Sequence, residues 1–370
     1  MTLIRRVVTV VGTRPEAIKM APVVLALRDS PMIESMLLAT GQHSGMFDDA
    51  LASFGLAPDL RLDADLTALQ PEVMAGEIKR RLMPFLRDLD PALVLVQGDT
   101  TSALAAAQAA SSCSIPVGHV EAGLRSHDLA RPWPEEGNRI AIDRLATLLF
   151  APTEGNLANL AADSEVKGEA YLTGNSGIDA LLHILRATPP RPKHEDRSQL
   201  LVTLHRRETI GRPMEQICTV LRDLADRGDV VLTVPLHPNP SVRSIVTSVL
   251  TAHPAIALIE PLPYPDMIAR IAASDLILSD SGGVQEEAPA LGVPLLIARD
   301  VTERPEAVSC GGAILCGTDP ETIRREAIRL IDDPASLATM AVPRFPFGRG
   351  DASGKIVAVI EDYLASRCVT

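Results

Sequence analysis

The chain has few aromatic residues and no long apolar run. Phe, Trp and Tyr make up only 3% of its 370 residues, so core packing must rest on Ala, Leu, Val and Ile. No apolar run reaches the roughly 18 residues that a membrane-spanning helix needs. The first residues lack the layout of a signal peptide and lead straight into a strand. We therefore expect a cytoplasmic protein that makes no contact with a membrane.

Cysteine pairs and metal-ligand clusters are also missing. The five cysteines are scattered, and no two of them form a CxxC pair. An odd number of isolated cysteines is typical of reduced packing thiols in a cytosolic enzyme. No group of histidine, cysteine and carboxylate residues has the spacing of metal ligands. We therefore expect neither a disulfide framework nor a bound metal.

The common nucleotide-binding motifs and a positive net charge are absent too. The run Gly12-Thr13-Arg14-Pro15 after the first predicted strand is neither a GxGxxG dinucleotide loop nor a P-loop with GKS or GKT. A dinucleotide cofactor and triphosphate hydrolysis are therefore disfavoured. The net charge of −12 argues against non-specific binding of nucleic acid. An anionic ligand must then be held by local positive groups.

Apolar strands alternate with helices along the whole chain, which predicts parallel, doubly wound sheets. The predicted strands cover 6–11, 36–40, 93–97 and 116–120, and then 200–204, 230–234, 255–259, 276–279 and 294–298. A proline-rich connection separates the two series, and the length fits two α/β domains. We predict two Rossmann-like domains, one of residues 1–172 with a C-terminal helix in 354–370 and one of residues 173–353.

Polar residues stand at the carboxyl ends of these strands, which is where open α/β sheets bind ligands. They are Arg14, Lys19, Asp99, Glu121, His205, Arg206, His237 and the run Ser281-Gly282-Gly283. Because the strand ends of each sheet meet at one edge, we expect these residues to line an active-site cleft between the domains.

The run Ser281-Gly282-Gly283 opens a helix and suits a diphosphate. Glycines let the backbone approach the ligand, and a helix N-terminus offers unpaired N–H groups and about half a positive charge. An ordinary Ser-Gly helix cap is the structural alternative. Glu287 could accept both ribose hydroxyls or be a solvated helix glutamate. Arg304 could be a second anchor or could pair with Glu303 or Glu306.

Several carboxylates in the first half indicate proton transfer. Asp99, Glu121 and the pair Glu135-Glu136 lie where a shared cleft would let them take up and release protons. Inverting a carbon atom needs a base on one face and an acid on the other, whereas binding alone needs at most one such group. Asp99 could instead cap a helix, and the pair could simply begin one; Glu121 is harder to explain structurally.

Histidines next to arginines form the remaining candidate group. His205 precedes Arg206, and together they could stabilise a leaving diphosphate. His237 has a similar position after a later strand. A lone histidine after a strand is more often structural, so that alternative stays open.

Together these motifs resemble the non-hydrolysing UDP-N-acetylglucosamine (UDP-GlcNAc) 2-epimerases. The matching stretches run in order along nearly the whole chain: GTRPEAIKMAP at 12–22, GDTT at 98–101, HVEAGLR at 119–125, PWPEE at 132–136, NR at 138–139, HRRE at 205–208, DSGGVQEEAP at 280–289 and TERPE at 302–306. Each stretch alone is modestly specific, and the ordered set is highly specific.

The resemblance implies a fold like that of GT-B glycosyltransferases and a homodimer. It implies anti elimination of UDP from UDP-GlcNAc to give 2-acetamidoglucal, followed by re-addition to give UDP-ManNAc, without metal or redox cofactor. By position, the catalytic residues are Asp99, Glu121, Glu135 and His205. The resemblance implies nucleotide-sugar contacts by Arg14, Lys19, Ser281, Gly282, Gly283, Glu287 and Arg304. We expect Arg139, Arg206 and His237 to bind the substrate as well.

Some positions depart from the family pattern. Many bacterial members bind a second UDP-GlcNAc as an allosteric activator, through a glutamine and an arginine that Gly45 and Leu69 replace here. We therefore expect this activator site to be weakened or absent. Leu262 and Met267 stand where family members usually have a glutamine and an aromatic residue that contact the nucleotide base.

Three other functions remain open. A hydrolysing epimerase would release UDP and free ManNAc, and the absence of activator residues suits it. A glycosyltransferase of the same fold would need an acceptor surface and one catalytic base. A catalytically inactive sugar-nucleotide sensor would not need the four catalytic side chains that this chain retains.

Overall fold

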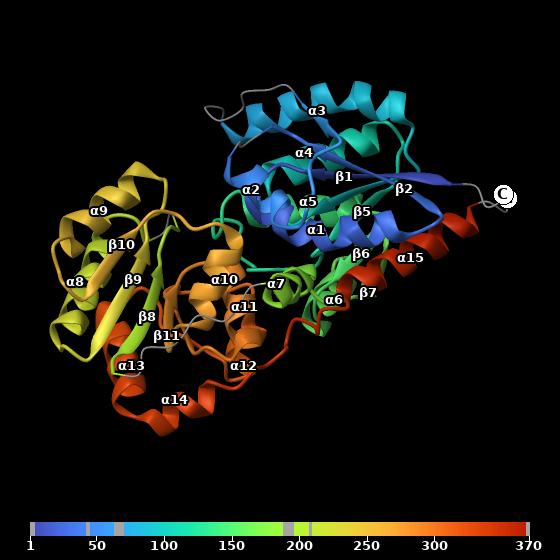
Figure 1. The fold of residues 1–370 in the computed structure, drawn as a ribbon. Helices are drawn as coiled ribbons and strands as arrows, with labels where there is room; N and C mark the ends of the chain where they lie inside the picture. Colours follow the sequence, from blue (N-terminus) through green and yellow to red (C-terminus); the bar gives the residue numbers. More distant parts are fainter. Residues whose placement is uncertain (1–3, 42–44, 63–69, 188–195, 207–208, 368–370) are drawn as a thin grey trace. The chain divides into compact units, whose positions relative to one another are not determined.

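The computed structural model describes residues 4–41, 45–62, 70–187, 196–206 and 209–367. The chain divides into two compact units, Met1–His183 with Phe347–Thr370 and Ile184–Pro346. Each unit contains one parallel sheet with flanking helices (Figure 1). The predicted α/β class with two doubly wound domains is confirmed. Among the described residues, no helix is both long enough and apolar enough to span a bilayer.

The first unit contains a seven-stranded sheet in the order β3-β2-β1-β4-β5-β6-β7. Its strands are β1 (Arg5–Val11), β2 (Ile33–Ala39), β3 (Leu60–Arg61), β4 (Leu93–Gln97), β5 (Val117–Val120), β6 (Leu148–Ala151) and β7 (Glu169–Leu172). The chain adds β2 and β3 on one side of β1 and then crosses to β4 on the other. In such sheets the ligand site lies outside the carboxyl ends at this change of direction.

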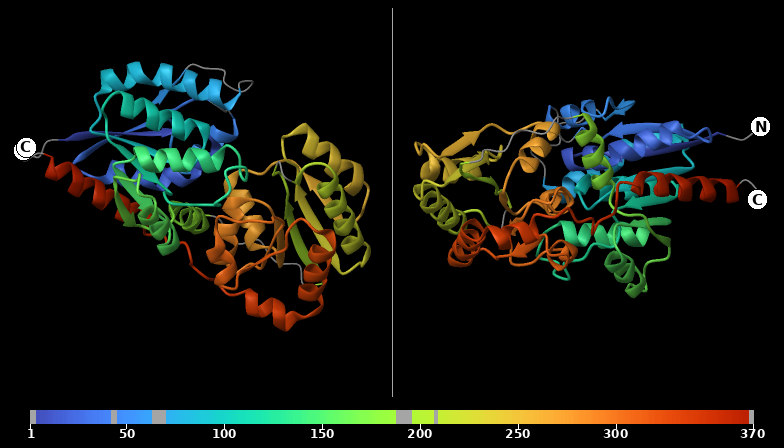
Figure 2. Two further views of the ribbon diagram at one scale, coloured as in Figure 1. Left: turned by 180° about the vertical axis from the view of Figure 1, so that it is seen from behind. Right: turned by 60° about the horizontal axis from the view of Figure 1, so that its bottom comes forward.

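Helices cover both faces of this sheet (Figure 2). They are α1 (Arg14–Asp29), α2 (Met46–Ala52), α3 (Pro71–Leu89), α4 (Thr101–Ser112), α5 (Glu135–Leu145), α6 (Glu154–Ala162), α7 (Ser176–Ala187) and α15 (Ala352–Ser366). The alanine-rich face of α4 is buried in one cluster with valines of β1 and β4. Small alanines let the helix lie close to the sheet, which explains how the core forms with few aromatic rings.

The second unit contains a six-stranded sheet in the order β10-β9-β8-β11-β12-β13. Its strands are β8 (Ser198–Thr203), β9 (Val230–Pro235), β10 (Ile256–Ile259), β11 (Leu276–Ser279), β12 (Leu295–Ile297) and β13 (Ala313–Leu315). Its helices are α8 (Arg212–Asp226), α9 (Pro240–Leu250), α10 (Tyr264–Ala272), α11 (Gly282–Leu291), α12 (Pro305–Ser309), α13 (Pro320–Asp332) and α14 (Pro334–Met340). Here the strand order changes direction between β8 and β11.

The C-terminal helix α15 belongs to the first unit, where it packs against α1. Helix α7 spans the point at which the units divide, whereas the sequence-based boundary lies before this helix, at 172/173. The reason for the difference is Asp179 on α7. Its carboxylate accepts the backbone N–H groups of Ala352 at 3.2 Å and Ser353 at 2.8 Å, and so caps α15 from another helix.

We expect Asp179→Ala to destabilise the protein by about 1 kcal/mol, because it leaves two N–H groups at the start of α15 without an acceptor. Asp351, the residue directly before α15, is the matched control because its side chain makes no capping hydrogen bond. Urea unfolding of both variants measures the effect. Equal losses for Asp179→Ala and Asp351→Ala would contradict the capping role of Asp179.

Candidate active site

A buried carboxylate closes the loop between β1 and α1. Glu16 Oε2 accepts the backbone N–H groups of Gly12 at 2.8 Å and Thr13 at 2.6 Å. Its Oε1 accepts the hydroxyl of Thr100 at 2.5 Å. Glu16 therefore ties the loop after β1 to the loop after β4. Burial raises the pKa of Glu16, and the hydrogen bonds from Thr100, Gly12 and Thr13 partly oppose this rise.

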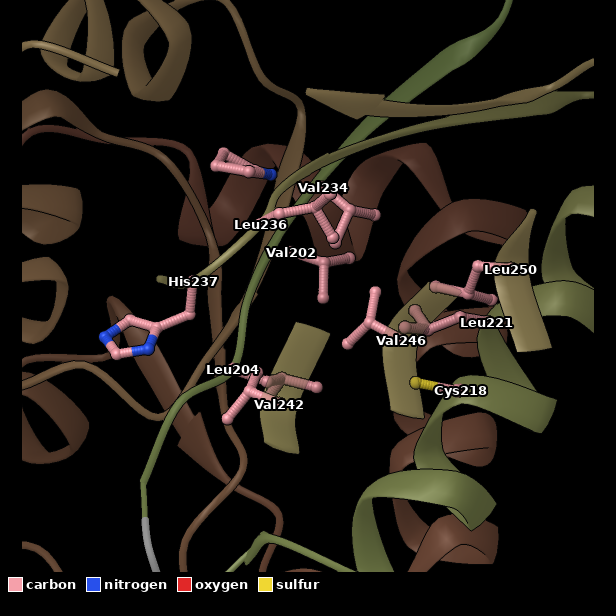
Figure 3. A pocket seen from close by; sticks show the side chains of 11 residues that line it. Val202, Leu204, Cys218, Leu221, Val234, Leu236, His237, Val242, Val246 and Leu250 are labelled. Carbon is pink, nitrogen blue, oxygen red and sulfur yellow. The ribbon is translucent and has the colours of Figure 1, made fainter. Parts of the chain in front are cut away.

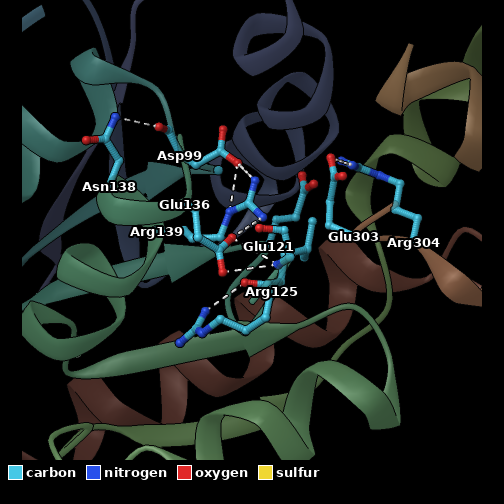
Figure 4. A network of polar contacts seen from close by, with 12 residues as sticks. Asp99, Glu121, Arg125, Glu136, Asn138, Arg139, Glu303 and Arg304 are labelled. Atoms are coloured by element: carbon cyan, nitrogen blue, oxygen red, sulfur yellow. Dashed lines mark hydrogen bonds and ion pairs between the residues drawn. The ribbon is translucent and has the colours of Figure 1, made fainter. Parts of the chain in front are cut away.

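Asp99 lies between β4 and α4 and is held by α5 (Figure 4). Arg139 donates to its carboxylate from Nε at 3.0 Å and also from Nη2. The Asn138 amide donates to the Asp99 carbonyl oxygen at 2.9 Å. The cap of α4 is Thr100, whose hydroxyl accepts the N–H of Ala103 at 3.0 Å. The structural alternative of Asp99 as the helix cap is therefore wrong.

Glu121 follows β5 and is nearly buried, with 7% of its surface exposed. Its φ of 69° is unusual for a residue with a side chain, and such values often mark functional sites. The carboxylate accepts hydrogen bonds from Lys19 Nζ at 2.6 Å and from the Gln97 amide. Removing one partner of such a buried ion pair typically costs about 3–5 kcal/mol. Lys19 therefore has a carboxylate partner within the first unit.

The two neighbouring carboxylates of α5 have different environments. Glu136 accepts the N–H groups of Ser126 at 3.0 Å and His127 at 3.1 Å, and it also pairs with Arg139 at 2.9 Å. It is therefore committed to holding the loop after β5. Glu135, the first residue of α5, has a buried Oε2 with no hydrogen-bond partner among the described residues. Of the two, Glu135 is the one with an oxygen available to a ligand.

Asp143, a buried residue on the same helix, contributes to this network and was not predicted from the sequence. Asp143 accepts Arg125 Nη1 at 2.7 Å and the N–H of Gly123 at 3.3 Å, and it bonds to His119 Nδ1 at 2.7 Å. The Nε2 of His119 donates in turn to the carbonyl of Gly98 at 2.8 Å. The signal was present as helical spacing, since positions 136, 139 and 143 recur every three or four residues.

The second unit brings His205, Arg206 and His237 together around a buried aspartate. Asp280 accepts the backbone N–H groups of His205 at 2.9 Å and Arg206 at 2.8 Å. The rings of His205 and His237 stack, with centroids 5.2 Å apart and planes inclined by 14°. Arg206 Nε is buried and has no acceptor among the described residues, which suits it to an anionic ligand.

His237 stands at the edge of the apolar core of the second unit. Its ring points away from the apolar side chains that line a small internal pocket (Figure 3). Burial lowers the pKa of His237, and the nearby charge of His205 lowers it further. Cys218 lies inside this core, where burial raises the pKa of its thiol to about 12. That thiol is therefore protonated at neutral pH and acts as a packing residue.

The N-terminus of α11 is open to a ligand in the way that its sequence suggests. Ser281 precedes the helix, and its side chain makes no capping hydrogen bond, so the ordinary-cap alternative fails. A Cβ atom on Gly282 would come within 2.9 Å of Arg304 Nη1. Gly282 therefore makes room for the guanidinium, while a Cβ atom on Gly283 would have no neighbour within 4 Å outside its own helix backbone among the described residues.

Glu287 and Arg304 both have partners within the second unit. Glu287 Oε1 accepts the hydroxyl of Tyr264 at 3.0 Å, so it is not simply a solvated glutamate. Arg304 donates to Glu286 from Nε at 2.5 Å and to Glu303 from Nη1 at 2.5 Å. The alternative of a pairing between Arg304 and Glu303 is thus correct. Arg304 lies at the start of α11 as a fixed cation.

The structure groups most of the expected residues within their own units. In the first unit, Lys19 and Arg139 contact the carboxylates directly, and Arg14 lies with Nη1 at 3.9 Å from Met46 Sδ of α2. In the second unit, the backbone after β8 bonds to Asp280, which follows β11 and precedes the start of α11. These sets contain positive groups suited to a diphosphate and carboxylates suited to proton transfer.

We expect Glu16→Ala to lower the free energy of unfolding by at least about 2 kcal/mol, because it leaves buried donors unpaired. Glu16→Gln should lower the free energy of unfolding by less.

The raised pKa of Glu16 also predicts an effect of pH on stability. Its contribution to the free energy of unfolding is largest below the unfolded value of 4.5 and is lost as pH rises through the folded pKa. The stability of the wild type relative to Glu16→Gln should therefore fall between pH 4.5 and neutral pH.

Chemical denaturation of both proteins at the two pH values measures this difference. A wild type that gains stability relative to Glu16→Gln as the pH rises would contradict the assignment.

Comparisons with known proteins agree on one family. A family model described as UDP-N-acetylglucosamine 2-epimerase matches residues 25–361. The UDP-N-acetylglucosamine 2-epimerase of Escherichia coli strain K12 is 42% identical over 374 residues, covering 96% of this chain and 98% of the relative.

Solved structures show the same likeness. The UDP-GlcNAc 2-epimerase from Neisseria meningitidis, bound to UDP-GlcNAc, superposes with a TM-score of 0.90 at 39% identity, over 96% of this chain and 100% of that one. The glycosyltransferase SnogD from Streptomyces nogalater shares the fold alone, with a TM-score of 0.58 at 17% identity over 96% and 99% of the two chains. The chain belongs to the UDP-N-acetylglucosamine 2-epimerase family.

Proposed function

We propose that the protein is a non-hydrolysing epimerase that interconverts UDP-GlcNAc and UDP-ManNAc. Family membership supports the reaction class, and the Neisseria meningitidis relative was crystallised with UDP-GlcNAc. The observation that carries the chemistry is the buried Oε2 of Glu135, which has no hydrogen-bond partner in the part of the chain that the structure describes. It adjoins Glu136, whose partner Arg139 also holds Asp99. A free acceptor within a network of fixed carboxylates suits proton transfer at carbon.

The reaction is an elimination followed by an addition. A carboxylate removes the proton from C2 of the sugar, the C1–O bond breaks, and its electron pair leaves with the diphosphate oxygen of UDP. The products, 2-acetamidoglucal and UDP, stay bound. A carboxylic acid then returns a proton to the opposite face of C2 as the diphosphate oxygen re-forms the bond to C1. Glu135 is one proton carrier, and Asp99 and Glu121 supply the remaining carboxylates.

The second unit holds the nucleotide in this proposal. The uncapped N–H groups of α11 and the buried Nε of Arg206 neutralise the diphosphate. Glu287 accepts the ribose hydroxyls, and His205 stabilises the charge that develops on the departing UDP. In this proposal the first unit supplies the carboxylates for proton transfer and the second unit supplies the groups that bind the nucleotide. By resemblance to the family, the protein works as a cytoplasmic homodimer.

Exchange at C2 tests the reaction directly. In D₂O, we expect the wild type to convert UDP-GlcNAc to UDP-ManNAc and to place deuterium at C2 of both sugars, because only cleavage of the C2–H bond allows exchange. NMR spectroscopy follows both signals. Absence of exchange would contradict epimerisation and favour a transferase or a sensor. Stoichiometric release of free ManNAc and UDP would establish the hydrolysing alternative.

Variants in the same assay test the role of Glu135. Glu135→Gln should slow exchange about 100-fold or more, the usual worth of a positioned acid or base. Glu165→Gln is the matched control, since Arg144 at 3.4 Å is the one polar partner of its exposed side chain among the described residues, and it should react like the wild type. Exchange at the wild-type rate by Glu135→Gln would remove this residue from the mechanism without removing the function.

The proposal includes a weakened activator site. Gly45, which stands where relatives have a glutamine, precedes α2 with φ 77° and carries no side chain to hold a second substrate. Leu69, which stands where relatives have an arginine, lies outside the described residues. We expect initial rates to rise hyperbolically with UDP-GlcNAc, and UDP-ManNAc to react without added UDP-GlcNAc. A sigmoidal rate curve in a steady-state assay would show that activation persists.

A further inference from the structure

Asp280, like Asp143, is a buried carboxylate that contacts a histidine side chain as well as backbone groups, but its histidine is the candidate catalytic residue His205. It follows β11 directly, is fully buried, and stands one residue before the loop at the start of α11. Its Oδ1 lies 3.1 Å from Nδ1 of His205. Besides the two backbone N–H groups already described, Oδ2 accepts the hydroxyl of Thr209 at 3.1 Å.

We propose that Asp280 is a positioning residue, which keeps a proton on Nδ1 of His205 and so directs Nε2 of that ring toward the substrate. The inference rests on the proposed function for what His205 does, but the orientation of the ring is a separate claim. It adds a residue to the reaction that touches no substrate itself.

The environment of Asp280 explains why Nδ1 must donate. Burial alone would raise the pKa of Asp280, but the hydrogen bond and charge of His205, with the N–H groups of Arg206 and His205, bring it below its ordinary value. The carboxylate is therefore ionised at neutral pH and can only accept hydrogen bonds. The facing nitrogen of His205 carries the proton, which leaves Nε2 as the nitrogen that exchanges a proton with a ligand.

His237 fixes the remaining freedom of the ring. Its imidazole stacks on that of His205, which fixes the plane of the His205 ring. Asp280 determines which edge of the ring faces the protein interior. Nδ1 of His237 accepts the N–H of Asn239 at 3.1 Å, so this nitrogen carries no proton. The His205 side chain is 32% exposed. With Nδ1 turned to Asp280, the Nε2 edge is the part that a ligand can reach.

This arrangement serves both directions of the reaction. As the C1–O bond breaks, a His205 ring protonated on both nitrogens gives its Nε2 proton to the diphosphate oxygen that receives the electron pair, and the ring is left neutral with its remaining proton on Nδ1. In the reverse step the same nitrogen recovers its hydrogen as the oxygen attacks C1. Nδ1 remains bonded to Asp280 throughout, so the ring does not need to turn between the two steps.

Three variants separate positioning from a merely structural role. In Asp280→Asn, the amide oxygen keeps the backbone N–H groups, so the NH₂ group faces Nδ1 and holds the ring neutral, with its one proton on Nε2, a form that cannot release this proton to the diphosphate oxygen. We expect kcat to fall about 100-fold or more, while KM and the Kd for UDP change less than about threefold. Thr209→Val is the matched control, because it removes one donor from the same carboxylate and leaves His205 in place; its kcat should stay within about threefold.

The third variant tests whether Asp280 acts through His205. In a His205→Asn background, Asp280→Asn should cost little further activity, because the residue it positions is gone. Independent losses that multiply in the double variant would overturn the proposal. So would a loss of UDP binding in Asp280→Asn that matches its loss of kcat, because a collapsed loop would explain both.

A spectroscopic measurement locates the proton on His205 without any measurement of activity. The chain has eight histidines, and ¹⁵N-labelled histidine with His205→Asn as the assignment variant identifies the His205 signals. We expect the proton on Nδ1 in neutral wild-type His205, and a wild-type ring protonated on Nε2 alone would overturn the proposal even if Asp280→Asn did not fold. Failure of the proposed function is recognised separately, as wild-type enzyme that exchanges no deuterium at C2.

Discussion

The arrangement of the first unit depends on one face of helix α5. Glu136, Arg139 and Asp143 recur on this face and turn toward the loops that follow β4 and β5. Through them a single helix holds the Asp99 carboxylate, the backbone after β5 and, by way of His119, the carbonyl of Gly98. Because unpaired buried polar groups are costly, the whole set must form together. This interdependence fixes the position of the Asp99 carboxylate. Glu135, at the start of the same helix, keeps one oxygen without a partner among the described residues.

Both units use buried carboxylates as acceptors for loop backbone. Glu16, Glu136 and Asp280 each accept two or more main-chain N–H groups in a loop at a strand end. Each therefore organises a segment that carries candidate functional residues. On this basis the buried acidic residues fall into two groups. Some accept hydrogen bonds from loop backbone, whereas others, such as Glu135, have an oxygen without a hydrogen-bond partner among the described residues. Sequence motifs contain both groups and do not distinguish them.

Much of the fold could be predicted because strands buried on both faces are continuous apolar runs. The strands at 93–97 and 276–279 were predicted at their observed bounds. Strand β6 was missed because its apolar residues follow those of α5 almost without a break. The edge strand β7 was missed because it has only four residues, of which three are exposed, and so lacks the longer buried apolar run of the central strands. An edge strand is defined by its neighbour, which local sequence does not reveal.

The sequence by itself determined the α/β class, the family and the set of polar residues at strand ends, since these depend on local pattern and residue order. Only the tertiary structure decided what each polar residue does. In the tertiary structure Glu136 accepts backbone N–H groups, whereas Glu135 keeps an oxygen without a partner among the described residues. Helix α15 is capped by Asp179 rather than by Asp351. The ring of His205 faces Asp280. Those partners lie far apart in the chain, and a hydrogen bond between distant residues exists only once packing brings its donor and acceptor within about 3 Å.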